Sequence, residues 1–411
     1  MPGMSLTHTV RELSIEQSAR PAIPSAGSTG MARAAPNSLP CSNMRDPNRT
    51  ADLCHGIERF FSYYGIDMRR FLALTLLLAS PILAAEPRRT RTLILVTADG
   101  LRWQEVFRGV DPELAKTVKP PVAPETREQL LPFLWKEVAT KGVILHGSVT
   151  NAYRVSYPGY SEILTGRAQD QAVKNNDPIQ NPVPTVLEVV RDQLKLSRTQ
   201  VALIGTWDTF RKIGEHTPGS VFINAGLQNL ELPGLPPRLT ELNRMQWELL
   251  TPWEGERHDY VTYQMALAYL QWQHPRLMHI AFGETDDWAH DKRYDNYLKA
   301  AHYYDACLRE LWNHVDHETT TLIMTCDHGR GSTANDWNSH GDDVQGAERT
   351  WIAIIGPDTP ARGELRGPND ARQRDIAPTI LSLFGIDPAA YPGVLGKPIE
   401  AALSGTPAAA R

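Results

Sequence analysis

Short segments rich in β-branched and apolar residues recur between residues 92 and 355, and segments with helical character alternate with them. The first of them, Thr92–Thr97, reads Thr-Leu-Ile-Leu-Val-Thr, which is typical of a strand buried on both faces of a parallel sheet. The expected strands are Thr92–Thr97, Val143–Leu145, Val201–Ile204, Leu277–Phe282, Thr320–Thr325 and Trp351–Ile355. The expected helices are Thr126–Thr140, Val186–Leu194, Tyr260–Trp272, Tyr294–Val315 and Ile376–Phe384. This alternation predicts the α/β fold class, with a single three-layer α/β/α domain around a mainly parallel central sheet.

The first 85 residues differ in composition from the alternating region. Residues 1–67 are rich in Ser, Pro, Ala and Arg and lack sustained periodicity. Residues 68–85 begin Met-Arg-Arg, continue with a short apolar run and end in small residues before Glu86, the order typical of a secretory signal peptide. Because a signal peptide normally starts at the initiator methionine, we interpret Met68 as the start of translation and residues 1–67 as a disordered upstream extension.

This organisation predicts one folded domain over residues 86–405 and a short tail over residues 406–411. We expect export to the periplasm or secretion from the cell. The apolar run within residues 68–85 is too short to span a bilayer comfortably, so no stable membrane anchor is expected.

The charge balance and the cysteine content exclude several classes of function. A net charge of −5 gives no indication of a surface that binds nucleic acid or a membrane. The chain has four cysteines and no Cys-x-x-Cys spacing, so neither a disulfide scaffold nor a thiolate zinc site is indicated. A bond between Cys307 and Cys326 stays open at this point, and so does the oligomeric state.

The stretch Asn151–Gly166 places Ser156 where a turn gives way to a helix. Pro158 fits the first turn of that helix, and Gly166 is a fitting terminator. A serine at this position lies among unpaired backbone N–H groups at the positive end of the helix dipole, which suits an oxyanion or a phosphoryl group. Serine is also a common helix cap, so the stretch by itself does not decide between the two roles.

Acidic residues and histidines follow several of the predicted strands directly. In a parallel sheet, ligands gather at the carboxyl ends of the strands, so these positions are expected to meet at one edge. The residues are Asp99, Asp286, His290, Asp327 and His328, joined by His340 in the loop before the last strand. Each could be explained alone, by a turn, a helix cap or a loop hydrogen bond. Clustered at one sheet edge, however, their charges would repel one another without a cation, and they offer enough donors for two zinc-like ions.

In this order, these residues resemble the alkaline phosphatase superfamily. The match rests on Asp99, Ser156 with Leu164-Thr165-Gly166, Asp286 with His290 four positions later, Asp327-His328-Gly329, and His340-Gly341. Within the superfamily, the sequence is most similar to the nucleotide pyrophosphatase/phosphodiesterase-like metal phosphoesterases. The resemblance covers roughly Thr90 to Pro398, so residues 86–405 would be the catalytic domain.

The resemblance implies a hydrolase that acts on phosphomonoesters or phosphodiesters through two divalent metal ions. Asp286, His290 and His340 would hold one ion, and Asp99, Asp327 and His328 would hold the other together with Ser156. Asp287 competes with Asp286, but the four-residue step to His290 favours Asp286. Ser156 would be the nucleophile and would form a phosphoserine intermediate. Zn²⁺ is the natural ion for Asp and His ligands, and Mn²⁺ accepts the same ligand types.

The resemblance also implies an asparagine that binds a phosphate oxygen about twenty residues after the nucleophile. Asn176 is the favoured candidate and Asn175 the second, although both also fit a polar turn before Pro178. Arginines that could contact phosphate are Arg154, Arg167 and Arg330, for which a surface position is the simpler expectation. The segment Gly219–Glu256, with Trp247 and Trp253, interrupts the alternation and is expected to be a surface excursion near the active site that influences the choice of substrate.

Four alternatives stay open. A sulfatase carries a (Cys/Ser)-x-Pro-x-Arg motif, which Ser156-Tyr157-Pro158 begins but which Tyr160 breaks at the arginine position. A metal-dependent phosphomutase of the same superfamily would transfer rather than hydrolyse phosphate, but no large inserted cap domain is apparent. A serine hydrolase with a Gly-x-Ser-x-Gly motif is disfavoured, because Ile163 replaces its second glycine. A binding protein with static metal ions predicts bound zinc without turnover.

Overall fold

The central sheet is organised around β1 (Thr92–Ala98), which lies between β5 and β6. The strands run in the order β4-β3-β5-β1-β6-β7-β2-β8, and β9 pairs with β2. Their bounds are β2 Val143–Ser148, β3 Val201–Gly205, β4 Phe222–Ala225, β5 Leu277–Phe282, β6 Thr320–Thr325, β7 Arg349–Ile355, β8 Gly363–Leu365 and β9 Ala371–Arg372. Strand β7 pairs antiparallel with β6 and β2, and the other strand pairs are parallel. The predicted mainly parallel sheet is thereby confirmed.

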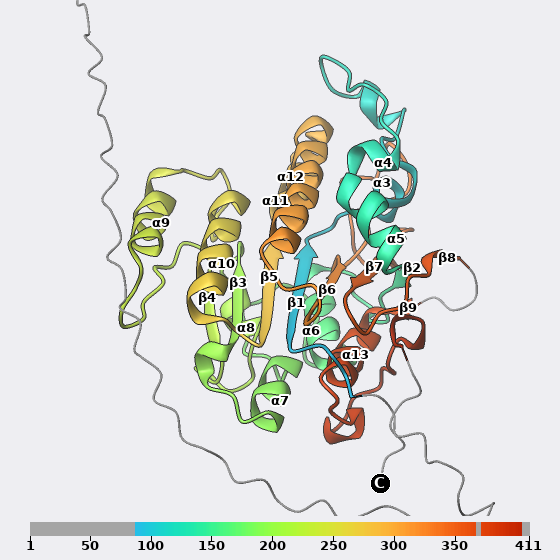
Figure 1. Cartoon of the computed structure of the whole chain (residues 1–411). Coiled ribbons are helices and arrows are strands. Elements are labelled where there is room, and N and C mark those ends of the chain that lie inside the picture. The colour runs from blue at the N-terminus through green and yellow to red at the C-terminus, as the bar shows by residue number, and fades with distance from the viewer. Residues whose placement is uncertain (1–86, 367–370, 405–411) are drawn as a thin grey trace, which may run out of the picture. The chain divides into compact units, whose positions relative to one another are not determined.

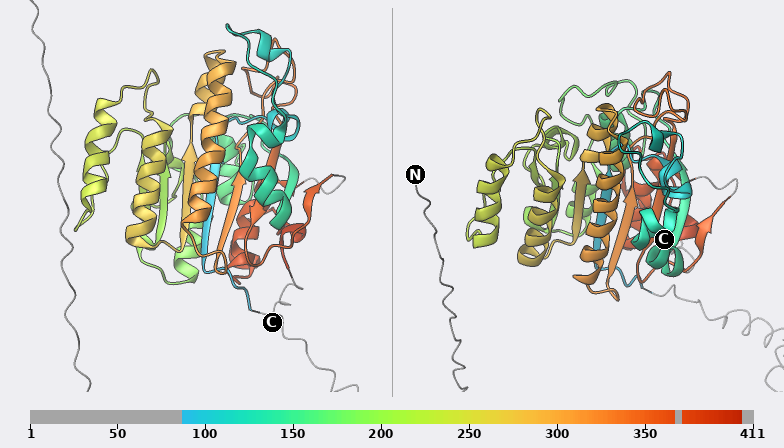
Figure 2. Two further views of the ribbon diagram at one scale, coloured as in Figure 1. Left: turned by 45° about the horizontal axis from the view of Figure 1, so that its top comes forward. Right: turned by 90° about the horizontal axis from the view of Figure 1, so that it is seen from above.

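Helices cover both faces of this sheet (Figures 1 and 2). Alternate side chains of β1 point to opposite sides, so Ile94 and Val96 join one hydrophobic core while Leu93 and Leu95 join the other. The first core includes α3 (Trp103–Arg108), α4 (Arg127–Leu130), α9 (Pro237–Glu248), α10 (Asp259–Gln273), α11 (Glu284–His290) and α12 (Tyr294–Asn313). The second includes α6 (Ser156–Thr165), α7 (Val186–Gln193), α8 (Phe210–Ile213) and α13 (Ile376–Leu383). These layers confirm the predicted α/β/α arrangement.

The predicted helix Thr126–Thr140 is wrong as one continuous element. The chain forms α4, a turn of π-helix over Leu134–Val138, and α5 (Ala139–Lys141). Pro132 explains the break, because its ring has no N–H and disfavours helical dihedrals at the preceding residue. The carboxylate of Asp305, on α12, accepts the backbone N–H groups of Phe133 and Leu134 at 2.8 and 3.0 Å and so stabilises the restart.

The segment Gly219–Glu256 does not interrupt the alternation, contrary to the prediction. It contains β4, which extends the sheet in parallel with β3, and α9, which packs beside α10. Strand β4 has only four residues and lies at the sheet edge, so its sequence signal is short. Helix α9 begins with Pro237 at its first position, where a proline is well tolerated.

The computed structural model describes residues 87–366 and 371–404. The predicted upstream extension (1–67), signal peptide (68–85) and tail (406–411) therefore lie outside the described residues. Within the described ranges, no helix is long and apolar enough to cross a membrane. Cys307 and Cys326 are buried free thiols, so the disulfide that the sequence left open is not formed.

Candidate metal centre

The site forms where the neighbouring strands β5, β1 and β6 end. Asp99 follows β1, Asp327 and His328 follow β6, and α11 follows β5 after a single glycine. Because these three strands are adjacent and parallel, their carboxyl ends deliver the side chains to one edge of the sheet. All seven residues that the sequence suggested as metal ligands meet at this edge, through the contacts described next.

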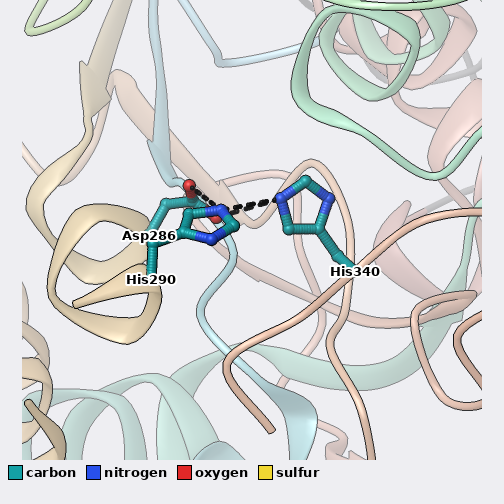
Figure 3. A group of neighbouring side chains, drawn as sticks. All are labelled: Asp286, His290 and His340. Atoms are coloured by element: carbon teal, nitrogen blue, oxygen red, sulfur yellow. Dashed lines mark hydrogen bonds and ion pairs between the residues drawn. The ribbon is translucent and has the colours of Figure 1, made fainter. Parts of the chain in front are cut away.

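One group of ligating atoms lies between α11 and the loop that carries His340 (Figure 3). Asp286 and His290 are one helical turn apart, and Asp286 Oδ2 lies 3.1 Å from His290 Nε2. His340 Nε2 approaches His290 Nε2 to 3.0 Å and Asp286 Oδ1 to 3.8 Å. Two imidazole nitrogens and a carboxylate that converge in this way are a ligand set suited to a zinc-like ion.

The second group surrounds Ser156, the first residue of α6. The Ser156 Oγ lies 3.5 Å from Asp99 Oδ1 and 3.4 Å from His328 Nε2. His328 Nε2 is also 3.4 Å from both Asp99 Oδ1 and Asp327 Oδ2. Val155 occupies the N-cap position and Ser156 is the first helical residue, so the serine hydroxyl is not used as the N-cap and faces the acidic and imidazole groups.

Asp286 connects the two groups. Its Oδ1 lies 3.7 Å from His328 Nε2, and Asp99, Asp286 and His328 by themselves bring ligating atoms within 4.8 Å of one another. Asp327 supplies a further oxygen, because its Oδ1 accepts the Gly100 N–H at 3.0 Å while its Oδ2 is buried without a hydrogen-bond partner. A buried carboxylate oxygen without a donor is costly, and a cation would satisfy it. The residues present therefore fit divalent ions.

Hydrogen bonds on the far side of two imidazole rings direct their Nε2 atoms into the site. His328 Nδ1 lies 2.9 Å from the Gly329 carbonyl oxygen, and His340 Nδ1 lies 3.2 Å from the Arg154 carbonyl oxygen. Each carbonyl accepts a hydrogen bond from the Nδ1–H group and so leaves the Nε2 lone pair for a cation. Arg154 adopts a left-handed conformation with φ 52°, which is uncommon for a residue other than glycine.

Burial and crowding shift the protonation of the site. Burial and the Asp99 carboxylate raise the pKa of Asp327 to about 8. Burial lowers the pKa of His328, but the Asp327 and Asp99 carboxylates outweigh it and raise that pKa to about 9. Burial and the nearby His328 hold the pKa of His340 well below its usual range. A proton on Asp327 or His328 would therefore compete with a cation, whereas the lowered pKa of His340 favours the neutral imidazole that can bind one.

The two asparagines lie in different surroundings, although both are exposed. Asn176 Oδ1 accepts the backbone N–H of Tyr157 at 2.9 Å, which places this side chain at the N-terminus of α6 beside Ser156. Asn175 Oδ1 instead accepts the N–H of Asp177 at 3.1 Å in a local turn. The geometry therefore places Asn176, and not Asn175, beside the start of α6, with its amide group left to donate.

The three arginines considered as phosphate contacts all have other neighbours. Arg154 donates to the Asp342 carbonyl at 3.2 Å and lies 3.7 Å from Glu348. Arg167 packs against Gly393, and Arg330 is fully buried against Asp286.

Sequence reasoning missed Glu256 as a neighbour of Asp287, the residue that competes with Asp286. Burial raises the pKa of both carboxyl groups, and the charge of Glu256 adds to the rise at Asp287. The geometry places Asp286, and not Asp287, beside His290 and His340. Tyr160, at the arginine position of the sulfatase motif, is fully buried, and burial together with Asp327 and Asp99 raises its pKa well above the usual range.

Comparisons with known proteins agree with this geometry. Residues 258–388 match the Metalloenzyme superfamily, a range that includes Asp286, His290, Asp327, His328 and His340. A 2,3-bisphosphoglycerate-independent phosphoglycerate mutase from Acaryochloris marina (strain MBIC 11017) is 33% identical over 130 residues, which is 29% of this chain. The chain spans only 23% of that relative's length.

Solved structures share the fold at low sequence identity. Wild-type alkaline phosphatase PafA superposes with a TM-score of 0.52 at 11% identity and covers 78% of this chain and 100% of its own. The lipoteichoic acid synthase LtaP from Listeria monocytogenes reaches a TM-score of 0.50 at 14% identity, with 76% of both chains covered. The family model thus covers five of the seven residues suggested as metal ligands, and the solved structures show a shared fold at low sequence identity.

Proposed function

We propose that this protein is a two-metal phosphoric ester hydrolase that uses Ser156 as its nucleophile. The observation that carries the proposal is the position of the Ser156 Oγ, within 3.5 Å of Asp99 Oδ1 and 3.4 Å of His328 Nε2, at the N-terminus of α6. Asp286, His290 and His340 would hold one ion, and Asp99, Asp327 and His328 would hold the other, with Zn²⁺ or Mn²⁺ as the candidates.

The chain's own groups suit attack on phosphorus. The divalent ions, when bound, would supply the positive charge that favours an ionised serine and a negatively charged leaving oxygen. The Ser156 Oγ would form a bond to phosphorus while the bond to the leaving alcohol breaks, which gives a phosphoserine. Backbone N–H groups at the start of α6 and the Asn176 amide would orient the phosphoryl oxygens. Water would then cleave the bond between phosphorus and the Ser156 oxygen, which would release phosphate from a monoester substrate or a phosphomonoester from a diester and return the serine to its hydroxyl form.

The charge of the site favours phosphodiesters over phosphomonoesters. A monoester carries close to two negative charges at neutral pH and a diester carries one. Arg154, Arg167 and Arg330 have other neighbours, so they do not offer a guanidinium for the second charge of a monoester. Asn176, a neutral donor, is the polar side chain beside the nucleophile helix. We therefore expect the diester to be the better substrate.

The alternatives from the same superfamily receive less support. The buried Tyr160 occupies the place of the sulfatase arginine, so a formylglycine motif is incomplete. Residues 157–285, which separate Ser156 from Asp286 and are all described, contribute β3, β4 and β5 to the central sheet instead of forming an inserted cap domain. A phosphomutase that encloses its substrate under such a cap is therefore disfavoured, despite the partial similarity to a phosphoglycerate mutase.

A parallel assay tests the reaction. The mature chain is given p-nitrophenyl phosphate, bis-p-nitrophenyl phosphate and p-nitrophenyl sulfate, with and without a chelator. We expect metal-dependent hydrolysis, fastest with the diester. The Ser156→Ala variant should keep its metal and lose activity by about a thousandfold or more. Sulfate hydrolysis alone would indicate a sulfatase, and bound zinc without turnover would indicate a static metal site.

Export is part of the proposal. The predicted signal peptide over residues 68–85 supports a mature chain that begins near Glu86 in the periplasm or outside the cell. N-terminal sequencing of the exported protein tests this, and a mature chain that retains residues before Met68 would contradict it.

A further inference from the structure

Arg330 is a fully buried arginine in the middle of the candidate metal centre. It follows Asp327-His328-Gly329 in the loop after β6, so its backbone belongs to the same loop as two proposed ligands. Its Nη2 forms an ion pair with Asp286 Oδ1 and also donates to the Asp286 carbonyl oxygen at 3.1 Å. Its Nη1 donates to the Asn338 carbonyl oxygen at 2.7 Å. One guanidinium thus joins α11 to the loop that carries His340, two residues beyond Asn338.

Gly100 makes room for this arrangement. A Cβ atom at Gly100 would lie 2.6 Å from Asp286 Oδ1 and 2.7 Å from Arg330 Nε, so a side chain there would collide with the pair. Gly100 also has φ 56°, a left-handed conformation that favours glycine. The loops after β1 and β6 and helix α11, which follows β5, therefore all meet at the Arg330–Asp286 pair.

The two oxygens of Asp286 have different neighbours as a result. Arg330 contacts Oδ1, which also lies 3.8 Å from His340 Nε2, whereas Oδ2 lies 3.1 Å from His290 Nε2. An arginine holds a carboxylate in a fixed plane, because its planar guanidinium donates in fixed directions. The Asp286 carboxylate is thus held in an orientation that presents Oδ2 to His290.

We propose that Arg330 is a positioning residue for the metal site formed by Asp286, His290 and His340. It orients Asp286 through Oδ1 and holds the His340 loop through Asn338. The inference rests on the proposed metal-dependent function, but it concerns metal affinity and is measured separately from turnover. A role in contacting the substrate phosphate is not required, since the side chain has no exposed surface.

A double-mutant cycle tests the inference on the full chain. Zinc affinity is measured by competition with a chromophoric chelator for wild type, Arg330→Met, Asp286→Asn and the double variant. We expect Arg330→Met to weaken one of the two zinc equivalents by about tenfold to a hundredfold, the usual effect of removing a partner of a metal ligand. Because Arg330 acts partly through Asp286, Arg330→Met should weaken zinc binding less in the Asp286→Asn background than in wild type, and the effect that remains reports its contact with Asn338.

Two further variants keep the test decisive. Arg330→Lys keeps the charge but cannot hold Asp286 and Asn338 together, so its zinc affinity should lie between those of wild type and Arg330→Met, even where Arg330→Met folds poorly. Arg257→Met is the matched control, because Arg257 is equally buried and donates to Asn224 and Thr262 instead of to a proposed ligand. It should bind zinc like wild type.

The outcomes separate the two proposals. Wild-type zinc affinity in Arg330→Met and Arg330→Lys, or additive losses in the double variant, would overturn the positioning role and leave the hydrolase proposal standing. A wild-type chain that binds neither Zn²⁺ nor Mn²⁺ would overturn both. A zinc affinity reduced equally in Arg257→Met would also overturn the inference, since the effect would then follow from the loss of any buried arginine.

Discussion

The backbone of Arg154 connects the nucleophile turn to a proposed metal ligand. Its carbonyl oxygen accepts from His340 Nδ1, and its left-handed conformation directs that carbonyl, whereas its side chain contacts Asp342 and Glu348. Sparsely populated conformations of this kind cost roughly 1 to 3 kcal/mol and often occur at functional sites. The residue is thus expected to act through its backbone more than through its guanidinium.

Substitutions at position 154 separate these roles. Arg154→Gly accepts the left-handed conformation and keeps the carbonyl, so zinc affinity and diester hydrolysis should stay within about threefold of wild type. Arg154→Val disfavours that conformation by about 1 to 2 kcal/mol and should weaken zinc binding by roughly tenfold. Zinc titration and steady-state kinetics of both variants check this. Equal losses of activity in both, with normal zinc affinity, would instead indicate that the guanidinium contacts substrate.

At the residue scale, the sequence identified which side chains gather but not how each is held. Asp99, Asp286 and Asp327 could be predicted because the carboxyl ends of adjacent parallel strands share one edge. The partner of each carboxylate depends on how loops far apart in the chain pack together. For that reason the sequence left Arg330 among surface arginines and did not reveal that Glu256 lies close to Asp287.

At the scale of elements, helices α10 and α11 cap each other. Asp259 Oδ1 accepts the Gly283 N–H at 2.9 Å and Asp259 Oδ2 accepts the Glu284 N–H at 3.1 Å, while Glu284 Oε1 accepts the Asp259 N–H at 3.1 Å. His258 completes the connection, with Nδ1 2.9 Å from Glu284 and Nε2 3.1 Å from the Leu250 carbonyl. Both ring nitrogens face acceptors, so the arrangement suits a protonated imidazole. It anchors the start of α11, the helix that carries Asp286 and His290.

This cluster predicts a pH dependence of stability. The hydrogen bond to Glu284 raises the pKa of His258 above its usual value, against the opposing effect of burial. Because the pKa of His258 is higher in the folded than in the unfolded protein, protonated His258 stabilises the fold. This contribution is fully present below the unfolded-state pKa of about 6.5 and is lost as the pH rises through the folded-state pKa. His258→Gln should therefore lower the melting temperature by a few degrees at pH 6 and by less at pH 9. Melting curves of both proteins across this range check it, and a constant difference would contradict it.

Element prediction succeeded where the pattern was long and failed where it was short or broken. The six central strands were found because each is a nearly continuous apolar run buried on both faces. The four-residue β4 and the three-residue β8 give too little pattern, and both lie at the edges of the sheet path. The break at Pro132 was missed because the helical pattern resumes on either side of it.

At the scale of the whole molecule, the sheet order decides where the metal centre lies. The central position of β1, between β5 and β6, brings together residues as distant in sequence as Asp99 and His340. Alternation of strands and helices predicted a parallel sheet but not this order, which follows from how crossover helices pack on the two faces. The site is therefore built from loops that depend on the complete sheet, so metal binding and global stability are expected to be coupled.

His340→Ala tests this coupling. The variant removes one Nε2 from the group with Asp286 and His290 and leaves Asp99, Asp327 and His328 in place. Zinc at a thousandfold excess over its dissociation constant stabilises a folded protein by about 4 kcal/mol per site. We expect zinc to give this stabilisation at two sites in wild type and at one site in His340→Ala. The activity of His340→Ala should be lower than that of wild type by orders of magnitude. Metal analysis, melting curves with and without chelator, and diester hydrolysis provide the three measurements.

Ser156→Ala is the matched control for this experiment. It removes a hydroxyl at the other group and keeps all three imidazoles, so its zinc-dependent gain in melting temperature should stay close to that of wild type while hydrolysis is lost. The pair of variants then separates metal binding from chemistry, because only His340→Ala changes both. A His340→Ala protein with normal zinc content and a normal rate would contradict the assignment of His340 as a metal ligand. The proposal that the β6–β7 loop and α11 share a metal ion would then also fail.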